Sequence, residues 1–67
     1  MTKDKEKGFI QGVVYACGFL VEDHDLPTLA SELLNETGFS KEDLRFANEY
    51  DLAKCRKAIP GLPKGKL

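Results

Sequence analysis

The amino-acid sequence predicts an all-α protein, a small bundle of three to four short helices. Apolar side chains recur at helical spacing along most of the chain, and residues that cap helices precede several of these stretches. Gly38 and Pro60 stand at the ends of such stretches, where they end helices. The 67 residues suffice for one domain. We place a single helical domain at residues 1–59 and a flexible basic tail at residues 60–67.

The first helix is expected from about Lys5 to Asp23. Three glycines and two adjacent valines lower its helix propensity, so a β-strand over Phe9–Tyr15 stays open as the alternative. The expected core side of this helix holds Phe9, Ile10, Val13, Val14, Ala16, Cys17, Leu20 and Val21. The opposite side holds Gly8, Gly12, Tyr15, Gly18 and Phe19. A helix that is apolar around most of its circumference needs cover on both sides.

The second helix is expected to begin after Asp25, whose carboxylate would cap it. Pro27 falls in the first turn, where a missing N–H leaves no hydrogen bond unmade. Gly38 is expected to end the helix in the left-handed conformation. The side expected to pack on the core consists of Leu26, Leu29, Ala30, Leu33 and Leu34.

A short third helix is expected after Ser40, a good N-cap residue. Phe39 before this cap and Leu44 after it form the pair of a hydrophobic staple. Asn48 is expected to cap a fourth helix, about Glu49–Ala58. The side of the fourth helix expected to face the core holds Leu52, Cys55 and, just beyond its end, Ile59. From Pro60 onward the sequence shows no packing pattern.

The net charge is −1, but the acidic and basic residues are unevenly distributed along the chain. Residues 22–51 hold nine acids against Lys41 and Arg45, whereas residues 52–67 hold five bases and no acid. The middle of the chain is therefore acidic and its end is basic. An acidic segment repels phosphate groups and attracts basic partners.

The sequence predicts no catalytic, cofactor or metal site, and we expect the protein not to be an enzyme. Cys17 and His24 stand seven residues apart, which on one helix places them ~10 Å apart, too far to share a metal ion. Cys17 and Cys55 fall at core-facing positions, as structural cysteines do. The longest apolar run, Val13–Val21, is much shorter than the ~20 residues that span a bilayer. We expect a cytoplasmic protein without membrane partners.

The second and third helices, joined by a turn at Gly38, also fit a helix-turn-helix. Leu34 occupies the position where such a motif needs a small residue, and the segment is acidic. The simpler interpretation is a helical hairpin that packs its own core. A small DNA-binding transcriptional regulator stays open as the alternative function, although we do not expect nucleic acid as the partner.

The segments Phe19–Leu34 (FLVEDHDLPTLASELL) and Glu49–Leu52 (EYDL) resemble short proteins encoded in bacteriophages and prophages, which commonly have no assigned function. The resemblance covers about residues 16–59 and carries no catalytic motif. It implies the cytosol of a bacterium or of a phage-infected cell. It also implies that the protein acts by binding a host or phage macromolecule.

The function we expect is that of a small non-enzymatic interaction or modulator protein. It would act as a homodimer or by binding a host or phage protein. The residues expected to contact the partner are Gly8, Gly12, Tyr15 and Phe19, together with an acidic patch that would steer a basic partner, Glu32, Glu36, Glu42 and Asp43. The alternative for the two rings is that the N- and C-terminal segments of the chain half-cover them.

Overall fold

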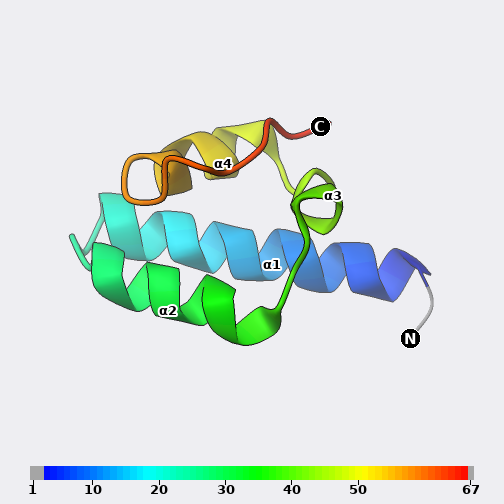
Figure 1. Cartoon of the computed structure of the whole chain (residues 1–67), viewed down its shortest axis with the longest axis horizontal. Coiled ribbons are helices and arrows are strands. Elements are labelled where there is room, and N and C mark those ends of the chain that lie inside the picture. Colours follow the sequence, from blue (N-terminus) through cyan, green and yellow to red (C-terminus); the bar gives the residue numbers. More distant parts are fainter. Residues whose placement is uncertain (1–2, 67) are drawn as a thin grey trace.

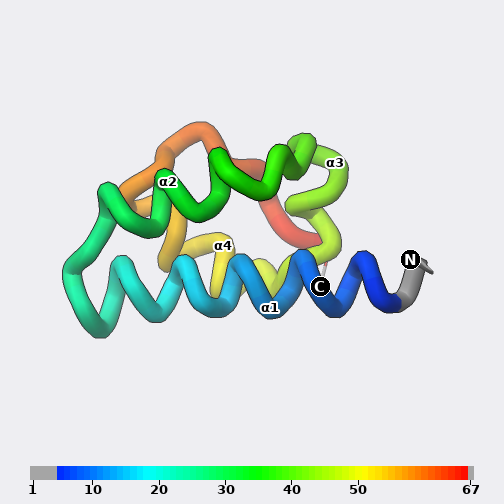
Figure 2. Tube along the Cα trace, turned by 90° about the horizontal axis from the view of Figure 1, so that it is seen from below, coloured from blue at the N-terminus to red at the C-terminus, as the bar shows by residue number. Residues whose placement is uncertain are grey.

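The computed structural model describes residues 3–66, which form four helices and no strand. The helices are α1 (Lys3–Glu22), α2 (Pro27–Thr37), α3 (Lys41–Leu44) and α4 (Glu49–Arg56). α1 runs along the whole molecule, which measures 33 × 20 × 18 Å, and α2 returns antiparallel beside it (Figures 1 and 2). α4 lies on the other side of α1 from α2 in Figure 1. The predicted all-α fold is confirmed, and the strand alternative is excluded because Phe9–Tyr15 lie within α1.

The core lies where α2 and α4 meet α1, and its contacts are made by small residues. The Cys17 thiol of α1 donates to the carbonyl of Ala30 in α2, with an S···O distance of 3.6 Å. The Cys55 thiol of α4 donates to the carbonyl of Val14 in α1 over the same distance. All four residues are fully buried. A Cβ built on Gly18 would lie 3.3 Å from the Cβ of Lys54, so α4 approaches α1 closely there.

The start of α2 differs from the expected one. Leu26 is its N-cap residue, and no side chain caps it. Asp25 instead adopts a left-handed conformation with φ of 52°, which non-glycine residues other than Asp and Asn rarely take. The Leu26 N–H donates to the Leu20 carbonyl at 2.8 Å. The prediction that Asp25 caps α2 is wrong because this residue makes the turn between the two helices.

The expected core side of α2 is only partly buried. Ala30 and Leu34 are buried, but Leu26, Leu29 and Leu33 are 43%, 49% and 36% exposed. Phe9, expected in the core, is 52% exposed and meets Phe39 only edge to face, with ring centroids 5.6 Å apart. The prediction that these side chains belong to the core is wrong, because the described chain places no third helix over this side of the α1–α2 pair.

Gly38, Ser40 and Asn48 end or begin helices as predicted from the sequence. Gly38 ends α2 with φ of 70°, in the left-handed conformation. Ser40 and Asp43 form a reciprocal capping box around the start of α3: the Ser40 hydroxyl accepts from the Asp43 N–H at 3.1 Å, and the Asp43 carboxylate accepts from the Ser40 N–H at 3.0 Å. Asn48 caps α4 by accepting from the N–H of Tyr50 at 2.8 Å. α4 ends at Arg56, two residues earlier than expected, and the chain continues in turns.

The segment 60–66 makes packing contacts that its sequence pattern does not predict, so that expectation is corrected. Leu62 is half-buried against the core, and the Lys66 N–H donates to the Arg45 carbonyl at 2.8 Å. The Gly65 N–H donates to the carboxylate of Glu49 at 2.9 Å. The segment runs back beside α4 in Figure 1. These contacts depend mainly on backbone groups, which a pattern of side chains does not reveal.

Gly65 is needed where the segment 60–66 meets the main chain, because a Cβ there would lie 2.6 Å from the Ala47 carbonyl oxygen. We therefore expect Gly65→Ala to detach this segment and to destabilise the fold by about 1 kcal/mol or more. Hydrogen exchange of the Lys66 amide measures the detachment, and chemical denaturation measures the stability. Gly61→Ala is the matched control, because a Cβ there meets nothing within 4 Å. Equal effects of the two substitutions would contradict the close approach at Gly65.

The same contact predicts an acid-dependent release of the segment. The hydrogen bond from the Gly65 N–H, followed by the ion pair with Arg56, lowers the pKa of Glu49 below its usual 4.5. A carboxyl whose pKa is lower in the folded state adds stability above its unfolded pKa and loses it as the pH falls through the folded value. We therefore expect Lys66 amide protection to decrease below pH ~4.5 in the wild type. In Glu49→Gln, protection should be low already at neutral pH and should not change in this range.

Candidate functional site

The outward side of α1 is open to solvent at each position predicted to bind a partner. Tyr15 is 61% and Phe19 42% exposed, and a Cβ on Gly8 or Gly12 would meet nothing within 4 Å. The contacts given for the C-terminal segment place it against Arg45 and Glu49 rather than over these rings. The alternative in which that segment covers Tyr15 and Phe19 is therefore not observed.

Three contacts align α1 and α2 along the whole length of α2. They join the rings of Phe9 and Phe39, the thiol of Cys17 with the carbonyl of Ala30, and the carbonyl of Leu20 with the amide of Leu26. In each pair the two residue numbers add to about 47, as expected of antiparallel helices in constant register. Leu26, Leu29 and Leu33 therefore lie at the levels of residues 21, 18 and 14 of α1, all within its apolar part.

The exposed leucines of α2 lie on the side turned away from α4. Pro27, Thr28, Ser31 and Glu32, on the other side of α2 from these leucines, line a shallow pocket together with Ala58, which follows α4. The leucines consequently adjoin the outward side of α1. We call the combined surface the α1–α2 face; its large exposed side chains are Phe9, Tyr15, Phe19, Leu26, Leu29 and Leu33.

Four of these six side chains are predicted from the sequence to lie in the core: Phe9, Leu26, Leu29 and Leu33. A signal was available, because five apolar residues on so short a helix are more than one neighbouring helix covers. Their periodicity shows that they share a side of the helix, but it does not show whether a second helix lies over that side.

Carboxylates border the α1–α2 face. Glu36 follows Leu33 by three residues and Glu32 follows Leu29 by three, so each neighbours a leucine of the face on the surface of α2. Glu32 also lines the shallow pocket next to Ala58. Asp23 and Asp25 lie in the loop at one end of the face. None of these four carboxylates has an ion-pair partner within residues 3–66.

The structure places the other two predicted acids on α3 rather than with Glu32 and Glu36. Glu42 pairs with Arg45 at 3.4 Å, and the Asp43 carboxylate is engaged in the capping box. The predicted acidic patch is therefore divided between α2 and α3. Asp43 also lines a groove, which is a separate feature of the surface.

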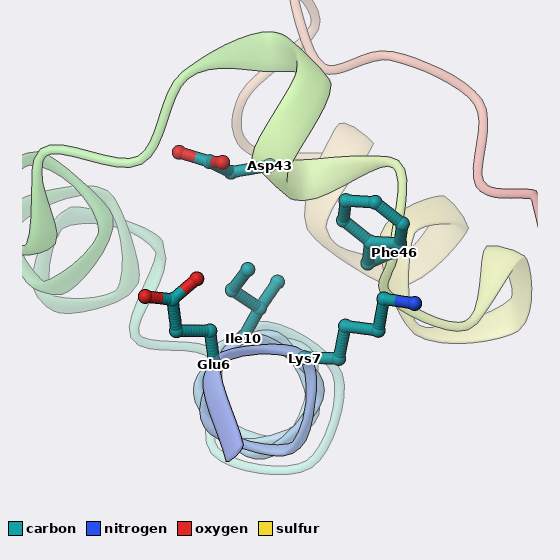
Figure 3. A pocket seen from close by; sticks show the side chains of 5 residues that line it. All are labelled: Glu6, Lys7, Ile10, Asp43 and Phe46. Carbon is teal, nitrogen blue, oxygen red and sulfur yellow. The ribbon is translucent and has the colours of Figure 1, made fainter. Parts of the chain in front are cut away.

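A groove of about 360 Å³ lies between the N-terminal half of α1 and α3. The carboxylates of Glu6 and Asp43 lie on one side, Lys7 and Phe46 on the other, and Ile10 forms the floor (Figure 3). The Lys7 ammonium lies 4.9 Å from the centre of the Phe46 ring, in a cation–π contact. An adjoining recess of about 260 Å³ shares Glu6, Ile10 and Asp43 and reaches Phe9 and Phe39. The groove thus begins at the edge of the α1–α2 face.

The two cysteines and His24 are the candidates for reactive or metal-binding side chains. Burial raises the pKa of the Cys17 thiol to about 11 and that of the Cys55 thiol to about 12, so both stay protonated near neutral pH. The His24 ring packs edge to face on Phe19, with centroids 4.6 Å apart. Residues 3–66 contain no group of three His, Cys, Asp or Glu side chains placed to hold a metal ion. None of the described helices combines the length and hydropathy needed to cross a membrane.

No protein-family model, curated protein or solved structure matches this chain. The resemblance to phage-encoded proteins therefore stays a prediction.

The exposed leucines of the face should contribute little to the fold compared with a buried leucine of the same helix. We expect Leu29→Ala to lower the free energy of unfolding by about 1 kcal/mol or less, because the side chain is 49% exposed. Leu34→Ala, the matched control, removes a side chain that is only 9% exposed and should lower it by about 3 kcal/mol. Urea denaturation measures both. Losses of equal size would show that Leu29 belongs to the core.

Proposed function

We infer that this chain is a small non-enzymatic interaction protein that uses the α1–α2 face to dock on another protein or on a second copy of itself. The observation that carries the proposal is that six large apolar side chains are exposed on two adjacent helices. At ~200 Å² for a fully exposed side chain, they present roughly 500 Å² of surface, the size of patch that is commonly functional on a small protein.

The two open glycines of α1 support a docking role. A glycine inside a helix lowers stability by about 1 kcal/mol relative to alanine, and nothing in the described chain packs against Gly8 or Gly12. The fold itself therefore does not need them. Exposed rings beside positions without side chains are suited to close contact with a partner helix.

The groove of Figure 3 gives less support to catalysis than to binding. Its lining has no serine, threonine, cysteine or histidine. The two thiols are buried and protonated away from it. A cytosolic setting in a bacterium or a phage-infected cell suits cysteines that stay reduced, and we include this setting in the proposal.

The alternative function, a small DNA-binding regulator of helix-turn-helix type, has weaker support. α3, which would read the DNA, has four residues and carries two acids in its first turn. A recognition helix needs several base-contacting side chains along its length. The bases of residues 52–67 lie on α4 and on the segment after it, not on α3.

Site-specific photocrosslinking tests the proposal. A benzophenone amino acid at Leu29 should give one discrete adduct with a protein chain in the cells that encode the protein. The same probe at Tyr50, which is 70% exposed on α4, is the matched control and should give none. Tyr15→Ser combined with Phe19→Ser should abolish the Leu29 adduct while leaving the circular dichroism spectrum unchanged.

Two results, one from this experiment and one from a salt titration against duplex DNA, would contradict the proposal. Equal labelling at Leu29 and Tyr50 would show that the α1–α2 face has no special role. Tight binding of the protein to nonspecific duplex DNA that collapses as salt is raised would favour the regulator instead.

A further inference from the structure

We propose that the partner on the α1–α2 face is a cationic amphipathic helix of another protein. Its apolar side chains would pack on the exposed apolar side chains of α1 and α2, and its Lys and Arg side chains would meet the carboxylates at the border. This inference rests on the docking function proposed above and specifies the chemistry of the partner.

Charge is the first argument for a cationic partner. Residues 22–37 carry five acids, Glu22, Asp23, Asp25, Glu32 and Glu36, and no Lys or Arg. Glu22, at the start of this segment, pairs with Lys57 at 2.8 Å, and outside the segment Glu49 pairs with Arg56 and Glu42 with Arg45. The four carboxylates that border the face are left without such pairs in the described residues. A basic partner would supply the charges that this part of the chain lacks.

The position of the chain's own bases argues against a second copy as the occupant. A two-fold dimer through this face would bring the acidic segment of one copy towards the same segment of the other. The bases of residues 52–66 lie on α4 and the segment after it, where Lys57 pairs with Glu22, Arg56 pairs with Glu49 and Lys66 lies over the Phe46 ring. Like charges brought together at an interface oppose association.

The dimensions of the face match a short helix. Leu26 to Leu33 cover about 10 Å along α2, and Phe9 to Phe19 cover about 15 Å along α1, at ~1.5 Å per residue. A helix of about three turns that presents apolar side chains at i, i+3 or i+4, and i+7 spans this length. Because a Cβ built on Gly12 would meet nothing within 4 Å, the backbone of the partner helix can approach α1 closely there.

The groove of Figure 3 provides a place for one basic side chain at the end of such a helix. Phe9 belongs to the α1–α2 face and also lines the recess that joins this groove. The carboxylates of Glu6 and Asp43 lie on the same side of the groove, while Lys7 is held over the Phe46 ring opposite them. A Lys or Arg that entered past Phe9 would therefore meet two carboxylates above an apolar floor.

Fluorescence anisotropy with synthetic peptides tests the inference on the full chain. The probe is a labelled helical peptide of about four turns with leucines at i, i+3, i+4 and i+7 and lysines or arginines elsewhere. One control peptide has the same composition with the leucines scrambled, and another keeps the leucines but carries glutamates in place of the bases. We expect saturable binding of the probe alone, weakened by added salt.

Variants of the protein then locate the binding site. Leu29→Gln should lower the affinity for the probe peptide at least tenfold. The double substitution Glu32→Gln with Glu36→Gln should lower this affinity several-fold. Glu42→Gln removes one charge on α3 and should leave the affinity unchanged. Amide chemical shifts should move around Phe19 and Leu29 but not around Tyr50, and circular dichroism should show that each variant is folded.

The outcomes separate this inference from the docking function. Equal binding of the scrambled or the acidic peptide would overturn the inference. So would a wild-type dimer, seen by sedimentation, that Leu29→Gln dissociates while the probe does not bind; in that case the occupant is a second copy and the docking function stands. Absence of probe binding, of a dimer and of a photocrosslinked adduct at Leu29 would overturn both.

Discussion

The rest of this structure depends on one constraint: the short helices of the chain can cover only part of the surface of α1. α1 has 20 residues and runs the length of the molecule, while α2 and α4 have 11 and 8. Both short helices pack close to α1 through small residues, α2 at Cys17 and Ala30, α4 at Gly18 and Cys55. A chain of 67 residues buries only about 60% of its unfolded surface, so little remains to cover the far side of α1.

The same arrangement separates the charges of the molecule. The bases that follow Leu52 lie on α4 and the segment after it, where Lys57 pairs with Glu22 and Arg56 with Glu49. The acids of α2 and of the loop before it lie where the chain provides few bases. The side of α1 that the fold leaves uncovered is therefore also bordered by unpaired negative charge. Apolar area and charge together define the type of partner more narrowly than either does alone.

Features that depend on neighbouring residues could be predicted from the sequence, and features that depend on distant elements could not. The capping residues Ser40 and Asn48 and the left-handed Gly38 act within one or two turns, so local sequence reveals them. The exposure of Leu29 depends on whether a further helix lies over α2, which periodicity does not encode. The docking of Gly65 depends on a close approach to the backbone of Ala47, which leaves no pattern of side chains. The outward positions of Tyr15 and Phe19 could be predicted because α1 is apolar around more of its circumference than the short helices can cover.

A helix bound on the α1–α2 face would complete the cover that the chain itself does not provide. It would remove Phe19 and Leu29 from water and place a third helix against the α1–α2 pair, as in a helical bundle. Binding of this kind stabilises the folded state, by about 2.7 kcal/mol when the free partner is at 100 times its Kd. For so small a domain, that is a large part of the total stability. Recognition of the partner and stability of the fold are then linked through one surface, although the side chains of that surface contribute little to the fold of the free chain.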